Sequence, residues 1–303
     1  MITKKAQNKD TYKREWIYTD SARNAWSDII EKYKLTNPNG KILLPGYIGW
    51  SANEGSGIFD SVVKSGLEYD FYDLDDHLKV DFEHLKQKVK QDPTQLVLLV
   101  HYFGFIDSRY DEITSWLINN KIFFVEDSAH AWLTDLIGGA CGRKGAFSFY
   151  SLHKLLPLSE GGIMVNNTVE GEKNSSVHPF FELGYDLHSI YSIRRYNFNY
   201  LTKLLKNVNG ITLIYNELGS GICPQTLPVS VDHYDRDALY HKMNEAGFGM
   251  VSLYHTMISQ LENSTSKAAS ILAGKIINFP IHQDVTEQDM EDMIIKLKEI
   301  LNA

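Results

Sequence analysis

Short apolar runs alternate with amphipathic segments along the first half of the chain, and this alternation predicts the fold. The apolar runs predict strands at residues 41–45, 67–74, 95–104, 121–127, 145–151 and 161–167. Apolar residues at helical spacing predict helices at residues 22–35, 58–66, 82–91 and 110–120. The run at 95–104 is apolar throughout, which is typical of a strand buried on both faces of a sheet. Strands that alternate with helices predict βαβ units around a mostly parallel sheet.

The pattern changes after about residue 170, where a polar stretch predicts a loop. Further helices are predicted at 190–205, 236–247 and 286–301, and further strands at 211–215 and 227–231. We therefore expect a large domain over residues 1–180 and a smaller α+β domain over residues 181–303. Residues 1–18 are polar, and we expect them to form a loose lead-in to the first helix.

Composition narrows the class of protein. Hydrophobic residues make up 43% of the 303 positions and charged residues 22%, which is ordinary for a soluble globular enzyme. The net charge of -8 gives no electrostatic reason to expect nucleic acid or an anionic membrane as the main partner. Two cysteines support neither a disulfide framework nor a zinc cluster, and no apolar run is long enough to span a membrane. We expect a cytoplasmic protein without a metal site.

Two segments carry the residues that chemistry would need. Asp127 ends the predicted strand 121–127, and Lys154 follows the predicted strand 145–151, with hydroxyl groups nearby. In parallel sheets, ligands bind at the carboxyl ends of the strands. A lysine amine can form a Schiff base with pyridoxal phosphate, and a carboxylate 4 Å from the pyridine nitrogen would stabilise its protonated form by about 4 kcal/mol at an effective dielectric near 20. Hydroxyls and the N-terminus of a helix would hold the phosphate.

These segments resemble the DegT/StrS family of pyridoxal-phosphate-dependent, fold-type I sugar aminotransferases. The resemblance rests on E-D-S-A-H-A at 126–131, F-S-F at 147–149, Lys154, and E-G-G at 160–162, with 27 residues from Asp127 to Lys154. Weaker similarities at 18–26, 42–52, 102–113 and 277–290 extend it over nearly the whole chain. The resemblance implies a large domain with a mostly parallel sheet flanked by helices, and a small C-terminal α+β domain.

The resemblance also implies roles for residues around the cofactor ring. Lys154 would be the Schiff-base lysine and the proton carrier. Asp127 would pair with the pyridine nitrogen, and His130 would lie against the ring or near its phenolic oxygen. Trp50 is a candidate to stack on the ring.

A second group of residues would hold the cofactor phosphate. Ser21, Ala22 and Arg23 would offer a helix N-terminus, although Ala22 stands where the family usually has glycine. Ser148 or Ser151 would add a hydroxyl, and the sequence leaves the choice open. Ser148 precedes Lys154 by six residues where five is more usual in the family, whereas Ser151 gives an S-x-x-K spacing.

The resemblance implies an aminotransferase that moves an amino group from an amino acid, with glutamate the expected donor, to a keto sugar. The sugar would be linked to a nucleotide and belong to cell-surface polysaccharide or secondary-metabolite biosynthesis, and the enzyme would be a homodimer with sites at the subunit interface. The family's G-x-N-x-R segment, which reaches into the partner's site, is shortened here, and the nearest match at 184–186 has Asp186 where Asn is expected.

Two alternatives remain open. A pyridoxal-phosphate-dependent sugar dehydratase would use the same scaffold, but that branch replaces the lysine by histidine. Lys154 therefore favours transamination, while His153 beside it keeps the dehydratase in play. The shortened segment and Ala22 also allow a degenerate, non-catalytic member of the family.

Overall fold

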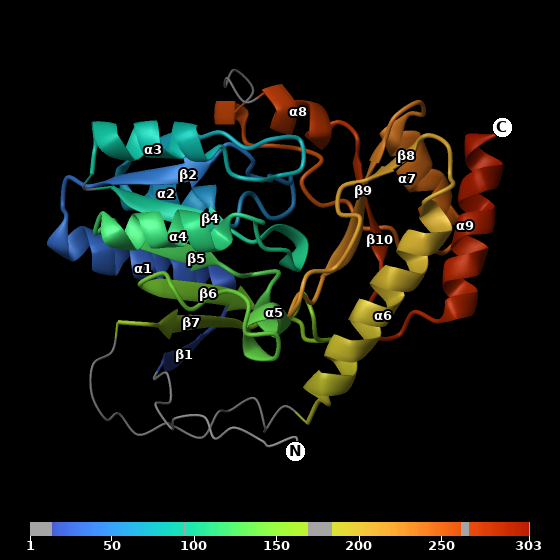
Figure 1. The fold of residues 1–303 in the computed structure, drawn as a ribbon, viewed down its shortest axis with the longest axis horizontal. Coiled ribbons are helices and arrows are strands. Elements are labelled where there is room, and N and C mark those ends of the chain that lie inside the picture. Colours follow the sequence, from blue (N-terminus) through green and yellow to red (C-terminus); the bar gives the residue numbers. More distant parts are fainter. Residues whose placement is uncertain (1–13, 94, 169–183, 262–266, 303) are drawn as a thin grey trace, which may run out of the picture.

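The computed structural model describes residues 14–93, 95–168, 184–261 and 267–302, and its larger part is built on a seven-stranded sheet (Figure 1). The strand order is β1-β7-β6-β5-β4-β2-β3. The strands are β1 (Glu15–Thr19), β2 (Lys41–Pro45), β3 (Glu68–Tyr72), β4 (Leu96–Val100), β5 (Phe124–Asp127), β6 (Phe147–Ser151) and β7 (Gly162–Asn166). β2 to β6 pair in parallel, whereas β7 pairs antiparallel with both β6 and β1. The sheet is therefore mostly parallel, as the alternation of strands and helices predicts.

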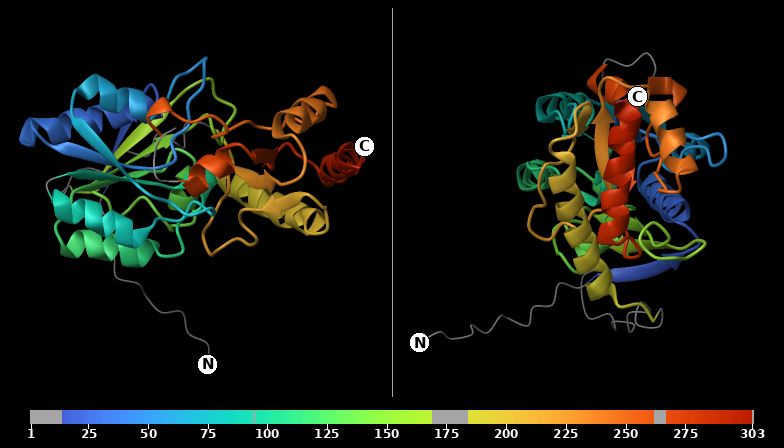
Figure 2. Two further views of the ribbon diagram at one scale, coloured as in Figure 1. Left: turned by 90° about the horizontal axis from the view of Figure 1, so that it is seen from above. Right: turned by 90° about the vertical axis from the view of Figure 1, so that its right-hand side faces the viewer.

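Helices cover both faces of this sheet. They are α1 (Ala22–Thr36), α2 (Phe59–Ser65), α3 (Phe82–Gln91), α4 (Tyr110–Asn119) and the short α5 (Trp132–Leu136). α1 and α2 lie on one face, and α3 and α4 lie on the other (Figure 2). Gly66, with φ of 71°, ends α2 in the left-handed conformation that glycine adopts without strain.

The C-terminal part has a smaller sheet, with strand order β10-β9-β8, and all its pairings are antiparallel. Its elements are α6 (Leu187–Leu205), β8 (Ile211–Leu213), β9 (Thr226–Val231), α7 (Arg236–Glu245), η3 (Ser259–Leu261), α8 (Lys267–Ala273), β10 (Ile276–Pro280) and α9 (Glu287–Leu301). This arrangement confirms the predicted α/β class with a small α+β part. The division at residue 180 stays a prediction, because residues 169–183 lie outside the described ranges.

The loose lead-in that the sequence predicts over residues 1–18 is wrong for residues 15–18. Glu15–Thr19 form β1, the edge strand that pairs with β7. The side chain of Arg14 holds this strand in place, because its guanidinium contacts both carboxylate oxygens of buried Asp135, at 2.9 and 2.6 Å. A five-residue edge strand whose partner is about 150 positions away in sequence is too short to show a strong period of its own. The rest of the lead-in, residues 1–13, lies outside the described residues.

Other differences concern elements that depend on tertiary packing. The apolar run at 95–104 is a strand only to Val100, and the turn η1 (Tyr102–Gly104) follows. Residue 103 is a phenylalanine with φ of 55°, a left-handed conformation that its apolar side chain does not signal. The sequence also misses α5, α8 and β10, each of which has seven residues or fewer.

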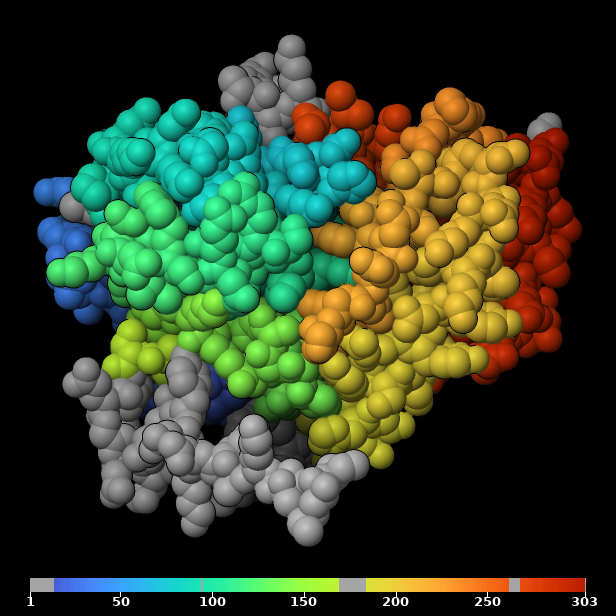
Figure 3. Space-filling view, in the orientation of Figure 1, coloured from blue at the N-terminus to red at the C-terminus, as the bar shows by residue number. Residues whose placement is uncertain are grey.

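One apolar core joins the two parts. It runs from Leu43, Tyr47 and Phe105 of the large part to Phe198 and Leu227 of the small part. Figure 3 shows the yellow and orange residues of the small part in broad contact with the green residues of the large part. Among the residues that the structure describes, no helix is long and apolar enough to cross a bilayer.

Candidate active site

A cavity of about 670 Å³ opens at the carboxyl ends of β5 and β6. Its walls come from the start of α1, the segment 48–58, the residues that follow β5 and β6, and the segment 252–255 of the small part. Eight of the nine site residues predicted from the sequence line it: Ser21, Ala22, Arg23, Trp50, Asp127, His130, Ser151 and Lys154. The fold thus gathers residues that are more than 130 positions apart in the chain around one space.

Asp127 and Lys154 face this cavity as a buried acid and an amine. Asp127 is 5% exposed, and burial raises the pKa of its carboxyl to about 6, although the backbone N–H of Ala129 donates to it at 2.9 Å. Burial also lowers the pKa of Lys154, against the opposing charges of Asp127 and Glu54. A lysine with a lowered pKa has more of its neutral form, which is the nucleophile.

His130 is a buried, neutral imidazole between aromatic rings. Its Nδ1 accepts a hydrogen bond from the backbone N–H of Phe103 at 3.1 Å, so the ring proton lies on Nε2. Burial first, and then the charges of Lys154 and His153, hold the pKa of His130 well below its usual range. The ring makes an edge contact with Tyr254 at 5.8 Å between centroids, which fixes its plane.

The N-terminus of α1 forms the wall that the sequence predicts for a phosphate. Ser21 is the N-cap, and its Oγ accepts a hydrogen bond from the backbone N–H of Asn24 at 3.1 Å. The first helical N–H groups and the positive end of the helix dipole favour an anion here. Ala22 is not among the residues with positive φ, so glycine is not required at this turn.

Gly162 explains the close fit between β7 and this helix terminus. A Cβ on Gly162 would lie 2.1 Å from the carbonyl carbon of Ser21 and 2.5 Å from the backbone nitrogen of Ala22. The neighbouring N–H of Gly161 donates to the carbonyl of Asp20 at 2.9 Å. The glycine pair therefore brings two backbone segments into contact, which side chains would prevent.

Alternation along β6 separates the two candidate serines. Phe149 and Ser151 line the cavity, whereas Ser148 does not. The hydroxyl of Ser148 donates to the carbonyl of Gly142 at 3.0 Å and lies 2.8 Å from the hydroxyl of Tyr150. Successive side chains of a strand point to opposite faces, so Ser148 and Ser151 cannot share one side.

The remaining predicted residues lie at the rim. The guanidinium of Arg23 donates to the carbonyl of Glu54 and contacts Asp60 at 3.4 Å, so it tethers the segment 51–57 to α1. Trp50 is 44% exposed and also lines a neighbouring cavity. Its ring is therefore placed at the mouth of the site.

The segment that carries Asp127 and Lys154 also matches a known protein family. Residues 56–178, which include Asp127, Ser151 and Lys154, match the model of the DegT/DnrJ/EryC1/StrS aminotransferase family. This segment belongs to that family. The match confirms the resemblance that the motifs at 126–131 and 160–162 indicate.

Solved structures of DegT/DnrJ/EryC1/StrS proteins and their relatives share the fold over almost the whole chain. An aminotransferase of this family from Brucella abortus is 18% identical, with a TM-score of 0.72 over 94% of this chain and 85% of its own. PseC from Helicobacter pylori, an aminotransferase involved in the biosynthesis of pseudoaminic acid, is 16% identical, with a TM-score of 0.74 over 95% and 86%. GDP-4-keto-6-deoxy-D-mannose-3-dehydratase from E. coli, solved with bound hydrated PLP, is 18% identical, with a TM-score of 0.73 over 93% and 87%.

The donor set fits pyridoxal phosphate. Asp127 is a buried carboxylate whose raised pKa shows that burial outweighs its hydrogen bond, and a protonated pyridine nitrogen would supply the missing opposite charge. The helix terminus at Ser21 and the hydroxyl of Ser151 offer donors for a phosphate, and Lys154 offers the amine.

Glu126, next to Asp127, connects the end of β5 to the segment 142–145. The buried carboxylate accepts hydrogen bonds from the backbone N–H groups of Gly142 (2.7 Å), Lys144 (2.9 Å) and Gly145 (2.9 Å), from the hydroxyl of Tyr110 at 2.9 Å, and contacts Nε2 of His101 at 2.8 Å. Burial alone would raise the pKa of Glu126, but these contacts lower it to about 2. Glu126 therefore fixes the end of β5, from which Asp127 reaches the cavity.

Sequence reasoning misses the contribution of the small part to the site. Ser252, Tyr254 and His255 line the cavity, about 100 residues after Lys154. The hydroxyl of Tyr47 donates to the carbonyl of Tyr254 at 2.9 Å, and the backbone N–H of Trp50 donates to the carbonyl of Thr256 at 3.0 Å. In the sequence, residues 252–255 show only a short run of polar and aromatic residues after the predicted helix 236–247, and this run does not indicate which part of the large domain they contact.

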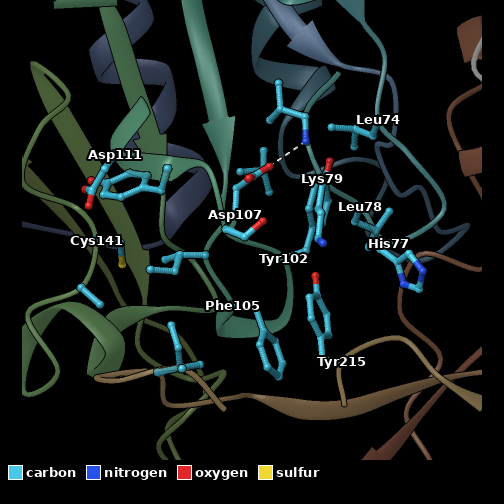
Figure 4. Close-up of a pocket in the computed structure, with 18 of the residues that line it drawn as sticks. Leu74, His77, Leu78, Lys79, Tyr102, Phe105, Asp107, Asp111, Cys141 and Tyr215 are labelled. Carbon is cyan, nitrogen blue, oxygen red and sulfur yellow. Dashed lines mark hydrogen bonds between the residues drawn. The ribbon is translucent and has the colours of Figure 1, made fainter. Parts of the chain in front are cut away.

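A larger cavity of about 830 Å³ lies between the two parts, away from Lys154 and Asp127 (Figure 4). Tyr102, Phe105 and Tyr215 line it, and the rings of Phe105 and Tyr215 stack at 3.8 Å. Its Asp107 accepts a hydrogen bond from the backbone N–H of Val80 at 2.7 Å. None of the predicted site residues lines this cavity, so the smaller cavity is the candidate active site.

Proposed function

We propose that this protein is a pyridoxal-phosphate-dependent aminotransferase that moves an amino group from an amino acid, with glutamate the expected donor, to a keto sugar. The observation that carries the proposal is the presence of Lys154 and Asp127 in one cavity with the N-terminus of α1. The family match over residues 56–178 supports it.

Pyridoxal phosphate, when bound, supplies a carbonyl that reacts with amines and a ring that accepts electrons. Nζ of Lys154 would bind that carbonyl and later carry a proton between substrate atoms. The carboxylate of Asp127 would keep a proton on the ring nitrogen. The N-terminus of α1 and the hydroxyl of Ser151 would hold the phosphate, and the imidazole of His130 would lie against the ring.

The proposal also covers the amino acceptor, the oligomeric state and the cellular compartment. We expect a keto sugar linked to a nucleotide, in the biosynthesis of a cell-surface polysaccharide or a secondary metabolite. The sugar aminotransferase CalS13 from Micromonospora echinospora, which shares the fold at 16% identity with a TM-score of 0.71 over 94% of this chain and 87% of its own, supports this choice. We also expect a cytoplasmic homodimer with sites at the subunit interface, which sedimentation of the purified protein would test. At the shortened cross-subunit segment, Asp186 caps α6 by accepting a hydrogen bond from the backbone N–H of Ser189 at 2.9 Å.

Spectroscopy of the purified protein tests the cofactor role of Lys154. Protein loaded with pyridoxal phosphate should show the visible absorbance band of the cofactor joined to a lysine. Lys154→Ala should lose that band, and Lys203→Ala, at an exposed position on α6, should keep it. If the wild-type protein shows no band after loading, the proposal fails and the non-catalytic alternative is favoured.

A dehydratase is the second candidate. His153 lines the cavity beside Lys154, and the E. coli dehydratase shares the fold. Lys154 favours transamination, because its amine could bind the cofactor and be displaced from it by the amino group of the donor. Glutamate should convert the visible band to the pyridoxamine form in a transaminase. No spectral change with any amino donor would count against transamination.

A further inference from the structure

A chain of polar side chains connects the interior of the small part to the candidate active site. Arg236, the first residue of α7, is buried, and its guanidinium donates to the hydroxyl oxygen of Ser252. The same guanidinium donates to the carbonyl of Ile276 at 2.8 Å and pairs with Asp237 at 2.6 Å. The hydroxyl of Ser252 lies 2.9 Å from Nδ1 of His255, and both residues line the cavity.

This chain of contacts lets the hydroxyl of Ser252 donate to His255. Because Ser252 accepts from Arg236, its own hydroxyl proton is available to Nδ1 of His255. With Nδ1 as the acceptor, the proton of a neutral imidazole lies on Nε2. Burial and the charge of Arg236 lower the pKa of His255, against the charge of Asp237 and a backbone hydrogen bond at Ser252, and the net lowering favours the neutral form. His255 therefore offers the cavity an oriented N–H donor.

The backbone beside His255 is held in a costly conformation. Tyr254 has φ of 59°, a left-handed value that costs a non-glycine residue about 1 kcal/mol or more. Tyr47 compensates, since its hydroxyl donates to the carbonyl of Tyr254 and the two rings stack at 5.3 Å. The turn thus places Ser252 and His255 within reach of each other and of the cavity.

Two other donors of the cavity already have hydrogen-bond partners. Arg23 is engaged by Glu54 and Asp60, and Ser151 lies 3.2 Å from Nδ1 of His153. Glu54 also acts on the pKa of both Lys154 and His153, so an anion near them would meet its negative charge. The charged groups that act on His255 are Arg236, which is buried, and Asp237, whose side chain is 71% exposed. The wall at His255 is therefore the better place for an anionic group of a substrate.

We propose that His255, positioned by Ser252 and Arg236, binds a carboxylate of the amino donor. This inference rests on the proposed function, since it assigns a substrate group to the same cavity. An α-amino acid always carries a carboxylate, and a fixed N–H donor backed by a buried guanidinium is a suitable partner for it.

The test combines a half-reaction with a binding measurement. In the half-reaction, glutamate is mixed with cofactor-loaded protein and the loss of the visible band is followed. His255→Leu should raise the apparent Kd for glutamate about 10-fold or more, because a hydrogen bond to a charged group is lost, with little change in the rate at saturation. His255→Gln, which can still donate, should recover most of the affinity, and Ser252→Ala should fall between the two.

Two controls identify the contact. His241→Gln changes an exposed histidine of α7 that does not line the cavity, and it should leave the Kd unchanged. Glutamine lacks the charge of the γ-carboxylate, and glutamate α-amide lacks that of the α-carboxylate. The penalty in His255→Leu should vanish with one of these two donors, which names the carboxylate. An equal penalty with glutamate and both analogues, or no penalty with any of them, would overturn the inference.

Binding of glutarate separates this inference from the proposed function. Glutarate has two carboxylates and no amine, so calorimetry measures its binding without any reaction. If no donor alters the wild-type band but glutarate binds the wild type at least 10-fold more tightly than His255→Leu, the aminotransferase proposal fails and the carboxylate site stands. If glutarate binds both proteins equally, the carboxylate site is refuted whatever the activity.

Discussion

Ser148 and Ser151 lie three residues apart on β6, and their substitution by alanine should have opposite consequences. Ser151 lines the cavity with the N-terminus of α1, whereas Ser148 bonds to the carbonyl of Gly142 on the other face of the strand. Ser151→Ala removes a hydrogen bond to a phosphate dianion, which is worth about 1.5–3 kcal/mol. The Kd for pyridoxal phosphate should therefore rise about 10- to 100-fold, with little loss of stability in the cofactor-free protein.

Ser148→Ala should instead lower stability and leave cofactor affinity unchanged. The carbonyl of Gly142 keeps hydrogen bonds from Arg14 at 2.6 Å and from Asn167 at 3.1 Å, so no acceptor is stranded. The cost should be about 1 kcal/mol, the usual worth of one buried hydrogen bond.

The assay is a titration of cofactor-free protein with pyridoxal phosphate, read by absorbance, together with urea unfolding of the same variants. Each serine is the control for the other, because both changes are made on one strand. Equal weakening of cofactor binding by the two variants would refute the assignment of Ser151 from strand alternation.

Three further predictions concern the surroundings of the cofactor. Gly162→Ala should destabilise the protein by about 3 kcal/mol or more and weaken cofactor binding, because the new Cβ meets the backbone of Ser21. The control Gly274→Ala should do neither in unfolding and titration experiments, because its new Cβ would lie 3.7 Å from the nearest atom and Gly274 does not line the cavity. Asp127→Asn should stabilise the cofactor-free protein above pH 6. The pKa of the Asp127 carboxyl is about 6 in the folded protein and near 4 in the unfolded chain, so the stability of the wild type falls by up to about 3 kcal/mol as pH rises between these values. Urea unfolding at pH 5 and pH 8 would show this, and a loss of stability in Asp127→Asn at pH 8 would contradict it. Glu126→Gln should have the opposite effect and destabilise the protein at pH 7. The pKa of Glu126 is about 2 when folded and above 4 when unfolded, so its ionised carboxylate stabilises the fold by about 3 kcal/mol above pH 4, and this contribution is lost as pH falls from 4 to 2. A variant as stable as the wild type at pH 7 would argue against this role.

The parts of the site that lie close together in sequence were accessible to prediction. Asp127 ends a buried apolar strand and Lys154 follows another, and strands of a parallel sheet bring their carboxyl ends to one edge. Ser21 stands directly before an amphipathic segment, which is where an N-cap is expected, and it does cap α1. These features depend on periods and positions within a few residues, and such local patterns survive without knowledge of the fold.

The choice between the serines needed the exact bounds of β6. Spacing to Lys154 allowed either serine, because the residues between the strand and the lysine can form turns of different length. The structure places Phe149 and Ser151 on the cavity side, which puts Ser148 with Tyr150 on the other. A shift of the strand by one residue would have reversed the result.

The sequence by itself determined the α/β class, the start of the first helix and the position of one acid and one lysine after neighbouring strands, because each follows from hydrophobic period, local hydrogen bonding or a short motif. Only the tertiary structure decided that Arg14 anchors an edge strand, and that Ser252 and His255 from the small part complete the cavity. Contacts of this kind join residues about 100 positions apart or more, and their free energy depends on burial and geometry that exist only once the two sheets have packed together.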